Sequence, residues 1–170
     1  MTPADLDDLA ALLVDAVDSN ASVGFAAGLG VAEARAWWEA RLADAQTTVL
    51  VERGADGRIA GTVQLVRSAY PNGRHRGEVA KLLVLRSARR QGLGERLMTR
   101  VEEEARRAGL LLLFLDTESG SDGDRLYRRL GWRAAGEIPD FAYRPDGVLR
   151  PTTFLYKRLG PPADDQDADR

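Results

Sequence analysis

Residues 86–109, RSARRQGLGERLMTRVEEEARRAG, place arginines and two glycines directly in front of an amphipathic helix. Helix N-termini carry unpaired N–H groups and a partial positive charge, and they bind phosphate groups readily. The basic residues form a local patch at Arg86, Arg89, Arg90 and Arg96. The pattern therefore predicts a site for a small phosphate-bearing ligand at the start of this helix.

The glycine spacing excludes two common phosphate-binding motifs. The dinucleotide fingerprint G-x-G-x-x-G needs a third glycine where this chain has Leu97. A P-loop needs a lysine followed by serine or threonine, and that pair does not follow Gly94. The segment instead fits the pattern R/Q-x-x-G-x-G/A, with the residues Arg89, Arg90, Gln91, Gly92, Leu93 and Gly94.

Three further side chains could hold or move protons. Glu78 opens one expected strand and Asp116 ends the next, so both carboxylates lie near one cleft if these strands are parallel neighbours. Taken alone, the residues favour plainer interpretations, an exposed strand end for Glu78 and a turn cap for Asp116. Tyr127 offers either an acidic hydroxyl or a packed aromatic ring. His75 stands between two arginines in a glycine-flanked loop, and we expect it to be exposed and not to act as a base.

Helix and strand patterns alternate along the chain. Apolar spacings of three and four predict helices over 4–17 and 31–43, with a glycine-rich loop at 20–30 between them. Trp37 and Trp38 are expected in the core, one buried and one at its edge. Strands are predicted over 47–52 and 59–66, joined by a turn at Asp56-Gly57, and over 78–85.

The second half of the chain continues this alternation. The helix after the phosphate-binding segment has a predicted buried stripe and Gly109 as its cap; the stripe is Leu97, Val101, Ala105 and Ala108. The apolar run 110–115 predicts a strand covered on both faces. A short helix over 121–130 and extended segments at 132–138 and 152–157 follow. A helix between two strands requires a right-handed parallel crossover, so we predict an α/β or α+β fold with an antiparallel hairpin beside a parallel pair.

Composition limits the remaining functions. The 170 residues suit one domain, expected over 1–159, with an acidic and disordered tail at 160–170. The absence of cysteine and the single histidine exclude a thiolate nucleophile and a multi-histidine metal site, so no metal is expected. The body is close to neutral, which gives no reason to expect nucleic acid. No signal peptide and no apolar run of about 18 residues are present, so we expect a cytoplasmic protein with no membrane partner.

Two motifs together resemble the GNAT superfamily of N-acetyltransferases. The Arg89–Gly94 pattern is similar to that superfamily's acyl-CoA pyrophosphate loop, and the segment Tyr127–Trp132 matches its Y-x-x-x-G-[FYW] pattern. Several shorter segments, among them Glu78–Leu82 and Leu115–Glu118, are similar to the tabtoxin resistance group within it. The similarity runs from about Asn20 to Leu159. One departure is that the usual N-terminal strand has no room before Ala4.

The resemblance implies a fold, a cosubstrate and a reaction. The fold would be a mixed, mostly antiparallel sheet whose central parallel pair splays to bind acyl-CoA, with about four helices around it. Acetyl-CoA would be held by backbone groups of Leu83, Val84 and Leu85 and by the loop from Arg89 to Glu95, which includes Arg90, Gln91, Gly92, Leu93 and Gly94. Glu78 and Asp116 would bind and deprotonate an amine, and Tyr127 would protonate the leaving sulfur.

We therefore expect direct acetyl transfer from acetyl-CoA to a small amino-acid-like, antibiotic-like or toxin-like amine, with Phe25 lining the acceptor pocket. Two alternatives stay open at this point. One is acetylation of a protein N-terminus or lysine, and the other is a non-catalytic acyl-CoA-binding regulatory module. The resemblance also allows a homodimer. Which of Glu78, Asp116 or an ordered water acts as the base is open as well.

Overall fold

The structure is a computed structural model that describes residues 1–160, so the predicted acidic tail falls, except for Gly160, outside the described residues. Four helices and six strands follow one another in the order that the sequence predicts. Their bounds are α1 Pro3–Asp18, α2 Val31–Ala43, β1 Thr47–Arg53, β2 Ile59–Arg67, β3 Arg76–Val84, α3 Leu93–Arg107, β4 Leu112–Glu118, α4 Asp122–Arg129, β5 Arg133–Tyr143 and β6 Leu149–Arg158.

Local sequence explains where α1 begins. The Thr2 hydroxyl accepts a hydrogen bond from the Asp5 backbone N–H, and the Asp5 carboxylate accepts one from the Thr2 N–H at 2.8 Å. This reciprocal capping satisfies two donors that the helix cannot pair internally, and Pro3 suits the first helical position. Within the described residues α1 has no strand before it, in agreement with the sequence.

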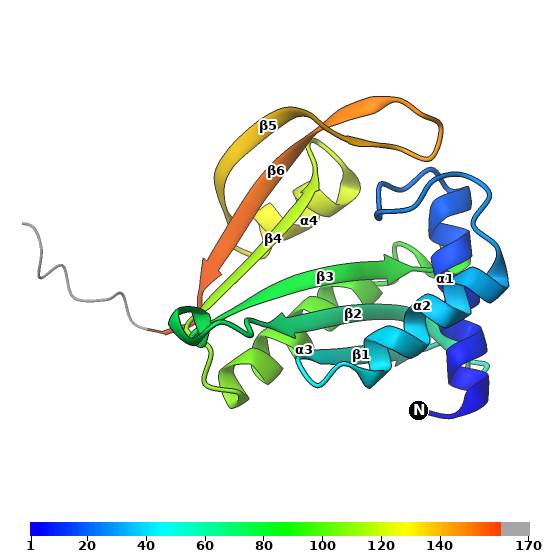
Figure 1. Ribbon diagram of the computed structural model, residues 1–170, viewed down its shortest axis with the longest axis horizontal. Coiled ribbons are helices and arrows are strands. Elements are labelled where there is room, and N and C mark those ends of the chain that lie inside the picture. Colours follow the sequence, from blue (N-terminus) through cyan, green and yellow to red (C-terminus); the bar gives the residue numbers. More distant parts are fainter. Residues whose placement is uncertain (161–170) are drawn as a thin grey trace, which may run out of the picture.

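The six strands form one mixed sheet in the order β1-β2-β3-β4-β6-β5, and Figure 1 shows its two halves. All neighbouring strands are antiparallel except β3 and β4, which are parallel. The helix between these two strands, α3, makes the crossover. The predicted fold class is confirmed, including the hairpin β1–β2 beside a central parallel pair.

The parallel pair is joined over only three register positions. Arg76, Gly77 and Glu78 of β3 face residues 112–114 of β4, and the two strands diverge after that point. Figure 1 shows β3 and β4 leaving a common end and separating toward their C-termini. Backbone groups beyond Glu78 therefore lose their partner on the neighbouring strand, which confirms the predicted splay.

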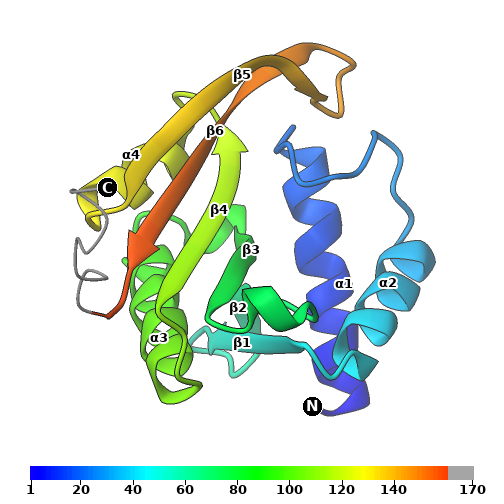
Figure 2. The same cartoon turned by 60° about the vertical axis from the view of Figure 1, so that its left-hand side comes forward.

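Helices cover both faces of the β1–β3 half of the sheet. Helix α3 packs on one face through Leu97, Val101 and Ala105, which are fully buried, while α1 and α2 pack on the other (Figure 2). Two sequence predictions were wrong here. Ala108 is exposed because it is the C-terminal cap of α3 and no longer part of its buried stripe.

The second wrong prediction concerns strand β4, which is not covered equally on both faces. Leu113 and Leu115 are fully buried, whereas Leu112 and Phe114 are half-buried and Leu111 is exposed. The alternation arises because only the face toward α3 belongs to the core. The opposite face of β4 is the one that carries Asp116.

Candidate active site at the divergence of β3 and β4

Glu78 and Asp116 lie together on the sheet face opposite α3. Glu78 is the register partner of Phe114, and Asp116 is two residues further along β4, so the two carboxylates are diagonal neighbours on one face. They stand where the parallel strands begin to diverge. Glu78 is half-buried and Asp116 is exposed. The structure thus brings together the two carboxylates that the sequence singled out.

The surroundings of Glu78 favour its neutral form. Burial raises the pKa of the Glu78 carboxyl above its ordinary value, and the negative charge of Asp116 raises it further, while Lys81 acts in the opposite direction. A carboxylate with a raised pKa accepts a proton more readily than an exposed one. This shift and its position at the divergence of β3 and β4 make Glu78 a candidate for proton transfer.

Tyr127 is positioned by the short helix α4. Ser121 caps this helix by accepting a hydrogen bond from the Asp124 N–H at 3.1 Å. The Tyr127 ring is buried and packs against Trp132, with ring centres 6.1 Å apart. Burial raises the pKa of the Tyr127 hydroxyl, and the charge of Asp116 contributes to the same shift. The hydroxyl therefore stays protonated at neutral pH.

The loop before α3 presents backbone donors to an anion. Arg90 and Gly92 both adopt left-handed conformations, at φ 63° and 77°, and Gly92 caps the helix without any side-chain hydrogen bond. Alternating backbone handedness gathers successive N–H groups into an anion-binding concavity. A Cβ on Gly94 would lie 3.2 Å from Leu126 of α4, so the backbone approaches its neighbour closely there. These features fit the pyrophosphate of an acyl-CoA.

The arginines of the predicted patch are mostly engaged with the protein itself. Arg86 binds Asp15 of α1 through its backbone N–H and its guanidinium, at 2.9 and 2.7 Å. Arg89 donates to the Ser19 hydroxyl at 3.0 Å, and Arg96 donates to the Gln91 carbonyl at 3.1 Å. These contacts fasten the loop to α1 and shape it from within. Three of the four arginines in the patch are thus partly engaged with the protein, and the backbone N–H groups of the loop offer further donors for an anion.

The backbone of β3 beyond Glu78 includes groups that point toward the diverging side, and Val84 is one of them. The Leu83 carbonyl faces Gly61 of β2, and the Leu85 N–H donates to the Ala60 carbonyl at 3.0 Å. Because backbone groups alternate in direction along a strand, Val84 points the other way. The Arg89 guanidinium donates to the Val84 carbonyl at 3.3 Å, which leaves the Val84 N–H for a ligand. The predicted backbone contacts at Leu83, Val84 and Leu85 stay predictions, and Val84 is the one of the three whose N–H points away from β2.

Aromatic side chains and one lysine border the carboxylates. Phe25 packs edge-to-face on Trp37 with ring centres 5.6 Å apart, and Trp38 is fully buried beside it, as expected of the two tryptophans. The Lys81 Nζ lies 5.4 Å from the centre of the Trp37 ring. Lys81 was not among the site residues predicted from the sequence. A charged residue inside the apolar strand Glu78–Leu85 was the signal that could have found it.

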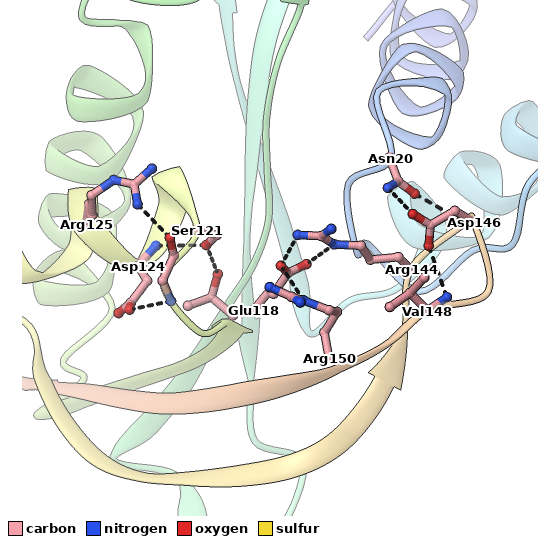
Figure 3. Close-up of polar contacts among 11 residues, drawn as sticks. Asn20, Glu118, Ser121, Asp124, Arg125, Arg144, Asp146, Val148 and Arg150 are labelled. Carbon is pink, nitrogen blue, oxygen red and sulfur yellow. Dashed lines mark hydrogen bonds and ion pairs between the residues drawn. The ribbon is translucent and has the colours of Figure 1, made fainter.

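The β5–β6 hairpin extends from this region to the loop after α1. Glu118, at the end of β4, accepts hydrogen bonds from Arg144 and Arg150 of the hairpin. The Asn20 side-chain amide donates to the Asp146 carboxylate at 2.6 Å, and the Asp146 N–H donates back at 3.1 Å. Figure 3 shows these contacts in one row from β4 to α1. The hairpin thereby connects the end of β4 to the α1–α2 loop.

Other sequence expectations concern residues outside this cluster. His75 is exposed, and its carbonyl accepts hydrogen bonds from the backbone at the start of β4. Among residues 1–160, no group of three or more His, Cys, Asp or Glu side chains is arranged to hold a metal ion. The helices of this same range are too short or too polar to cross a membrane.

Comparison with known proteins agrees with this geometry. Residues 10–132 match the acetyltransferase (GNAT) family. The L-methionine sulfoximine/L-methionine sulfone acetyltransferase of Pseudomonas paraeruginosa is 29% identical over 93% of this chain and 91% of its own. YncA of Salmonella typhimurium, solved with acetyl-CoA, superimposes with a TM-score of 0.80 at 24% identity over 96% and 93% of the two chains.

A third similar protein is the ribosomal-protein-alanine N-acetyltransferase of Brucella melitensis, with a TM-score of 0.79 at 26% identity over 93% and 96% of the two chains. The family match covers well over half of the chain, and it includes both the anion-binding loop and Tyr127. The chain therefore belongs to the acetyltransferase (GNAT) family and is an acetyl-CoA-dependent N-acetyltransferase.

Proposed function

We propose that this enzyme acetylates the amine of a small, amino-acid-like acceptor by direct transfer. The observation that carries the proposal is the pair Glu78 and Asp116 at the point where β3 and β4 diverge. Two carboxylates side by side attract an ammonium group. The Pseudomonas relative, named for two methionine analogues, supports an acceptor of the same size.

Acetyl-CoA supplies the acetyl thioester when it is bound. In the proposed arrangement, the N–H groups around Gly92 hold its pyrophosphate, and the Val84 N–H pairs with an amide of the pantetheine arm. An extended arm between these two points follows β3 toward Glu78. The acetyl group would then lie beside the two carboxylates, close to the amine that they bind.

The chain's own residues would move two protons. Glu78 takes a proton from the bound ammonium, because an alkyl ammonium with a pKa of about 10 has no free electron pair at neutral pH. The amine nitrogen then forms a bond to the acetyl carbon, and the carbon–sulfur bond breaks. Tyr127 donates its proton to the leaving sulfur and takes up the second proton that the nitrogen loses as the amide forms, so the one proton left over remains on Glu78 and is released to solvent. Since the chain has no cysteine, an acetyl-cysteine intermediate has no place in this sequence of steps.

The hairpin contacts favour a small acceptor over a protein chain. Asn20 and Asp146 join the α1–α2 loop to the β5–β6 hairpin, and an open groove for a polypeptide would need these segments apart. The similarity to an alanine N-acetyltransferase makes a protein acceptor the alternative to test. A role in detoxification and a homodimer stay predictions.

The test is release of coenzyme A thiol from acetyl-CoA in the presence of matched amines. The panel contains L-methionine sulfoximine, L-methionine sulfone, an aminoglycoside and a peptide with an N-terminal alanine. We expect the two methionine analogues to be turned over with the highest kcat/KM. Preference for the peptide would replace the proposal by protein acetylation. Binding of acetyl-CoA with no turnover on any amine would favour a regulatory module.

A further inference from the structure

Strand β3 contains a bulge that decides which face of the sheet Lys81 occupies. Between Thr62 and Gln64 of β2 the register shifts, so that residues 81 and 82 of β3 oppose a single residue. Lys81 adopts φ 51°, a left-handed conformation that L side chains rarely take. In a regular strand Lys81 would share a face with Val79, which packs in the core under α3. The bulge turns Lys81 away from that core, as bulges beside functional sites do.

The Lys81 ammonium lies on the same face as the two carboxylates. Its Nζ is 5.4 Å from the centre of the Trp37 ring and 3.8 Å from where a Cβ on Gly24 would stand. Burial lowers the pKa of the Lys81 ammonium, and the charges of Asp116 and Glu78 oppose that shift. The lysine therefore faces both carboxylates from beneath the α1–α2 loop.

A comparison with the other lysine shows what Lys81 lacks. Two of the chain's 24 lysine and arginine residues are lysines. Lys157 donates to both oxygens of Glu102, at 2.7 and 2.8 Å, and to the Leu130 carbonyl at 2.7 Å. Within residues 1–160, Lys81 has no comparable hydrogen bond or ion pair, only the Trp37 ring and the more distant carboxylates. A half-buried ammonium with unused donors suits an anionic group that arrives with a ligand.

We propose that Lys81 binds the carboxylate of the acceptor, and that the acceptor is therefore an α-amino acid bound as a zwitterion. This inference rests on the proposed function, which places the acceptor's amine at Glu78 and Asp116. In an α-amino acid the ammonium and the carboxylate are attached to one carbon, so its site needs opposite charges side by side. Glu78 and Lys81, three residues apart on one bulged strand, provide that arrangement.

Arg41 strengthens the positive side of this arrangement. Its guanidinium carbon lies 5.7 Å from the centre of the same Trp37 ring, and its charge is felt by Lys81. Two cations beside one aromatic ring repel each other, and the negative charge of a nearby acceptor carboxylate relieves that repulsion. Phe25 and Trp37 then flank the rest of the amino acid.

The experiment compares an α-amino acid with its carboxamide in the wild type and three variants. Steady-state kcat/KM is measured for L-methionine sulfone and for its carboxamide, with wild type, Lys81→Met and Lys81→Arg. Methionine replaces Lys81 because its side chain is also unbranched, which suits the left-handed backbone at φ 51°. Calorimetry of L-methionine sulfone binding then reports on the acceptor site without turnover. Arg35→Met on α2 is the matched control, because the ion pairs of Arg35 within residues 1–160 are those with Asp7 and Glu39 at the surface.

We expect the wild type to prefer the acid by about 10²-fold, as loss of a desolvated charge pair predicts. Lys81→Met should remove that preference through KM for the acid, leave the carboxamide within about threefold, and abolish binding of the acid. Lys81→Arg should restore part of the preference for the acid. Arg35→Met should keep the wild-type ratio of kcat/KM for the acid to kcat/KM for the carboxamide.

Two results would overturn the inference while the proposed function stands. They are a wild type that uses acid and carboxamide equally well, and a Lys81→Met enzyme that loses activity on both in the same proportion. The second result is what a purely structural role, or an effect of Lys81 on Glu78, would give. A wild type that binds acetyl-CoA but acetylates neither compound would overturn the proposed function together with the inference.

Discussion

Glu118→Gln should lower the free energy of unfolding by about 2–3 kcal/mol, because Glu118 ties the β5–β6 hairpin to β4. The Glu118 side chain is 10% exposed, and its carboxylate accepts from Arg144 Nε at 2.8 Å and from Arg150 Nε at 3.2 Å. Hydrogen bonds to charged groups contribute about 1.5–3 kcal/mol each, and neutral ones about 0.5–1.5 kcal/mol. In glutamine an NH2 group replaces one carboxylate oxygen. That NH2 group and a guanidinium N–H are both donors, so one of the hydrogen bonds from the arginines is lost.

The exposure of the two arginines sets the upper limit of this effect. Breaking a fully buried ion pair costs about 3–5 kcal/mol. The side chains of Arg144 and Arg150 are 30% and 39% exposed, so water replaces part of what they lose. Urea unfolding followed by circular dichroism measures the difference. Thermal unfolding gives a second measure. Since a domain of this size loses about 2–4 °C in Tm per kcal/mol, the Tm of Glu118→Gln should be lower than that of the wild type by about 4–12 °C.

Glu103→Gln is the matched control, because Glu103 pairs with Arg107 at 3.4 Å with both side chains at least half exposed. The same chemical change at that exposed pair should cost less than about 0.5 kcal/mol. A Glu118→Gln protein as stable as the Glu103→Gln protein would refute the reasoning about burial.

The pH dependence tests whether the charge of Glu118 is responsible. The hydrogen bond from Arg144 lowers the pKa of the Glu118 carboxyl below its ordinary value of 4.5. A group whose pKa is lowered by folding stabilises the protein above its unfolded value, and that contribution is lost as the pH falls through the folded value. The gap between wild type and Glu118→Gln should therefore be constant at neutral pH and shrink below about pH 4. A gap that persists unchanged in acid would contradict the assignment.

Three further substitutions test the proposed chemistry. Glu78→Gln should lower kcat/KM by about 10²–10⁴-fold at neutral pH; because the pKa of Glu78 is raised, the wild-type profile should lose activity with acid at a pH above 4.5, and the variant should lack that limb. Tyr127→Phe should bind acetyl-CoA normally in calorimetry and lose about 10²–10⁴-fold in kcat, and an unchanged kcat would leave Tyr127 a packing residue. Gly94→Asp should weaken acetyl-CoA binding in the same titration, since the new Cβ meets Leu126 at 3.2 Å and the carboxylate repels phosphate.

The fold was predictable because its signals are local and repeated. Leucines at helical spacing in residues 3–18 are buried in α1, and the order of strands and helices required one parallel crossover. The errors occurred where a local pattern ends. Ala108 continues the apolar stripe of α3 in sequence, but the chain leaves the helix at that residue. The run 110–115 is apolar throughout, but only alternate residues of β4 find a covering helix.

The cosubstrate side of the site was more predictable than the acceptor side for the same reason. The loop Arg89–Gly94 is one contiguous segment directly before α3, so six residues were enough to predict its position. The acceptor side is assembled from the α1–α2 loop, α2, β3 and β4, and the β5–β6 hairpin closes beside it. No spacing in the sequence records that Gly24 and Trp37 lie near Lys81.

Lys81 shows why strand patterns alone cannot assign the acceptor side. Alternation along β3 places Lys81 on the same face as Val79, in the core where a charge would be costly. The extra residue that reverses its direction becomes visible only when β3 is aligned with β2, because a bulge is a property of the pair. Glu78 precedes the bulge and keeps its register with β4, so its face of the sheet does not depend on the bulge. The face on which Lys81 lies does depend on it. The position of one bulge therefore determines which charge accompanies Glu78, and it does so without altering the loop proposed to hold the cosubstrate.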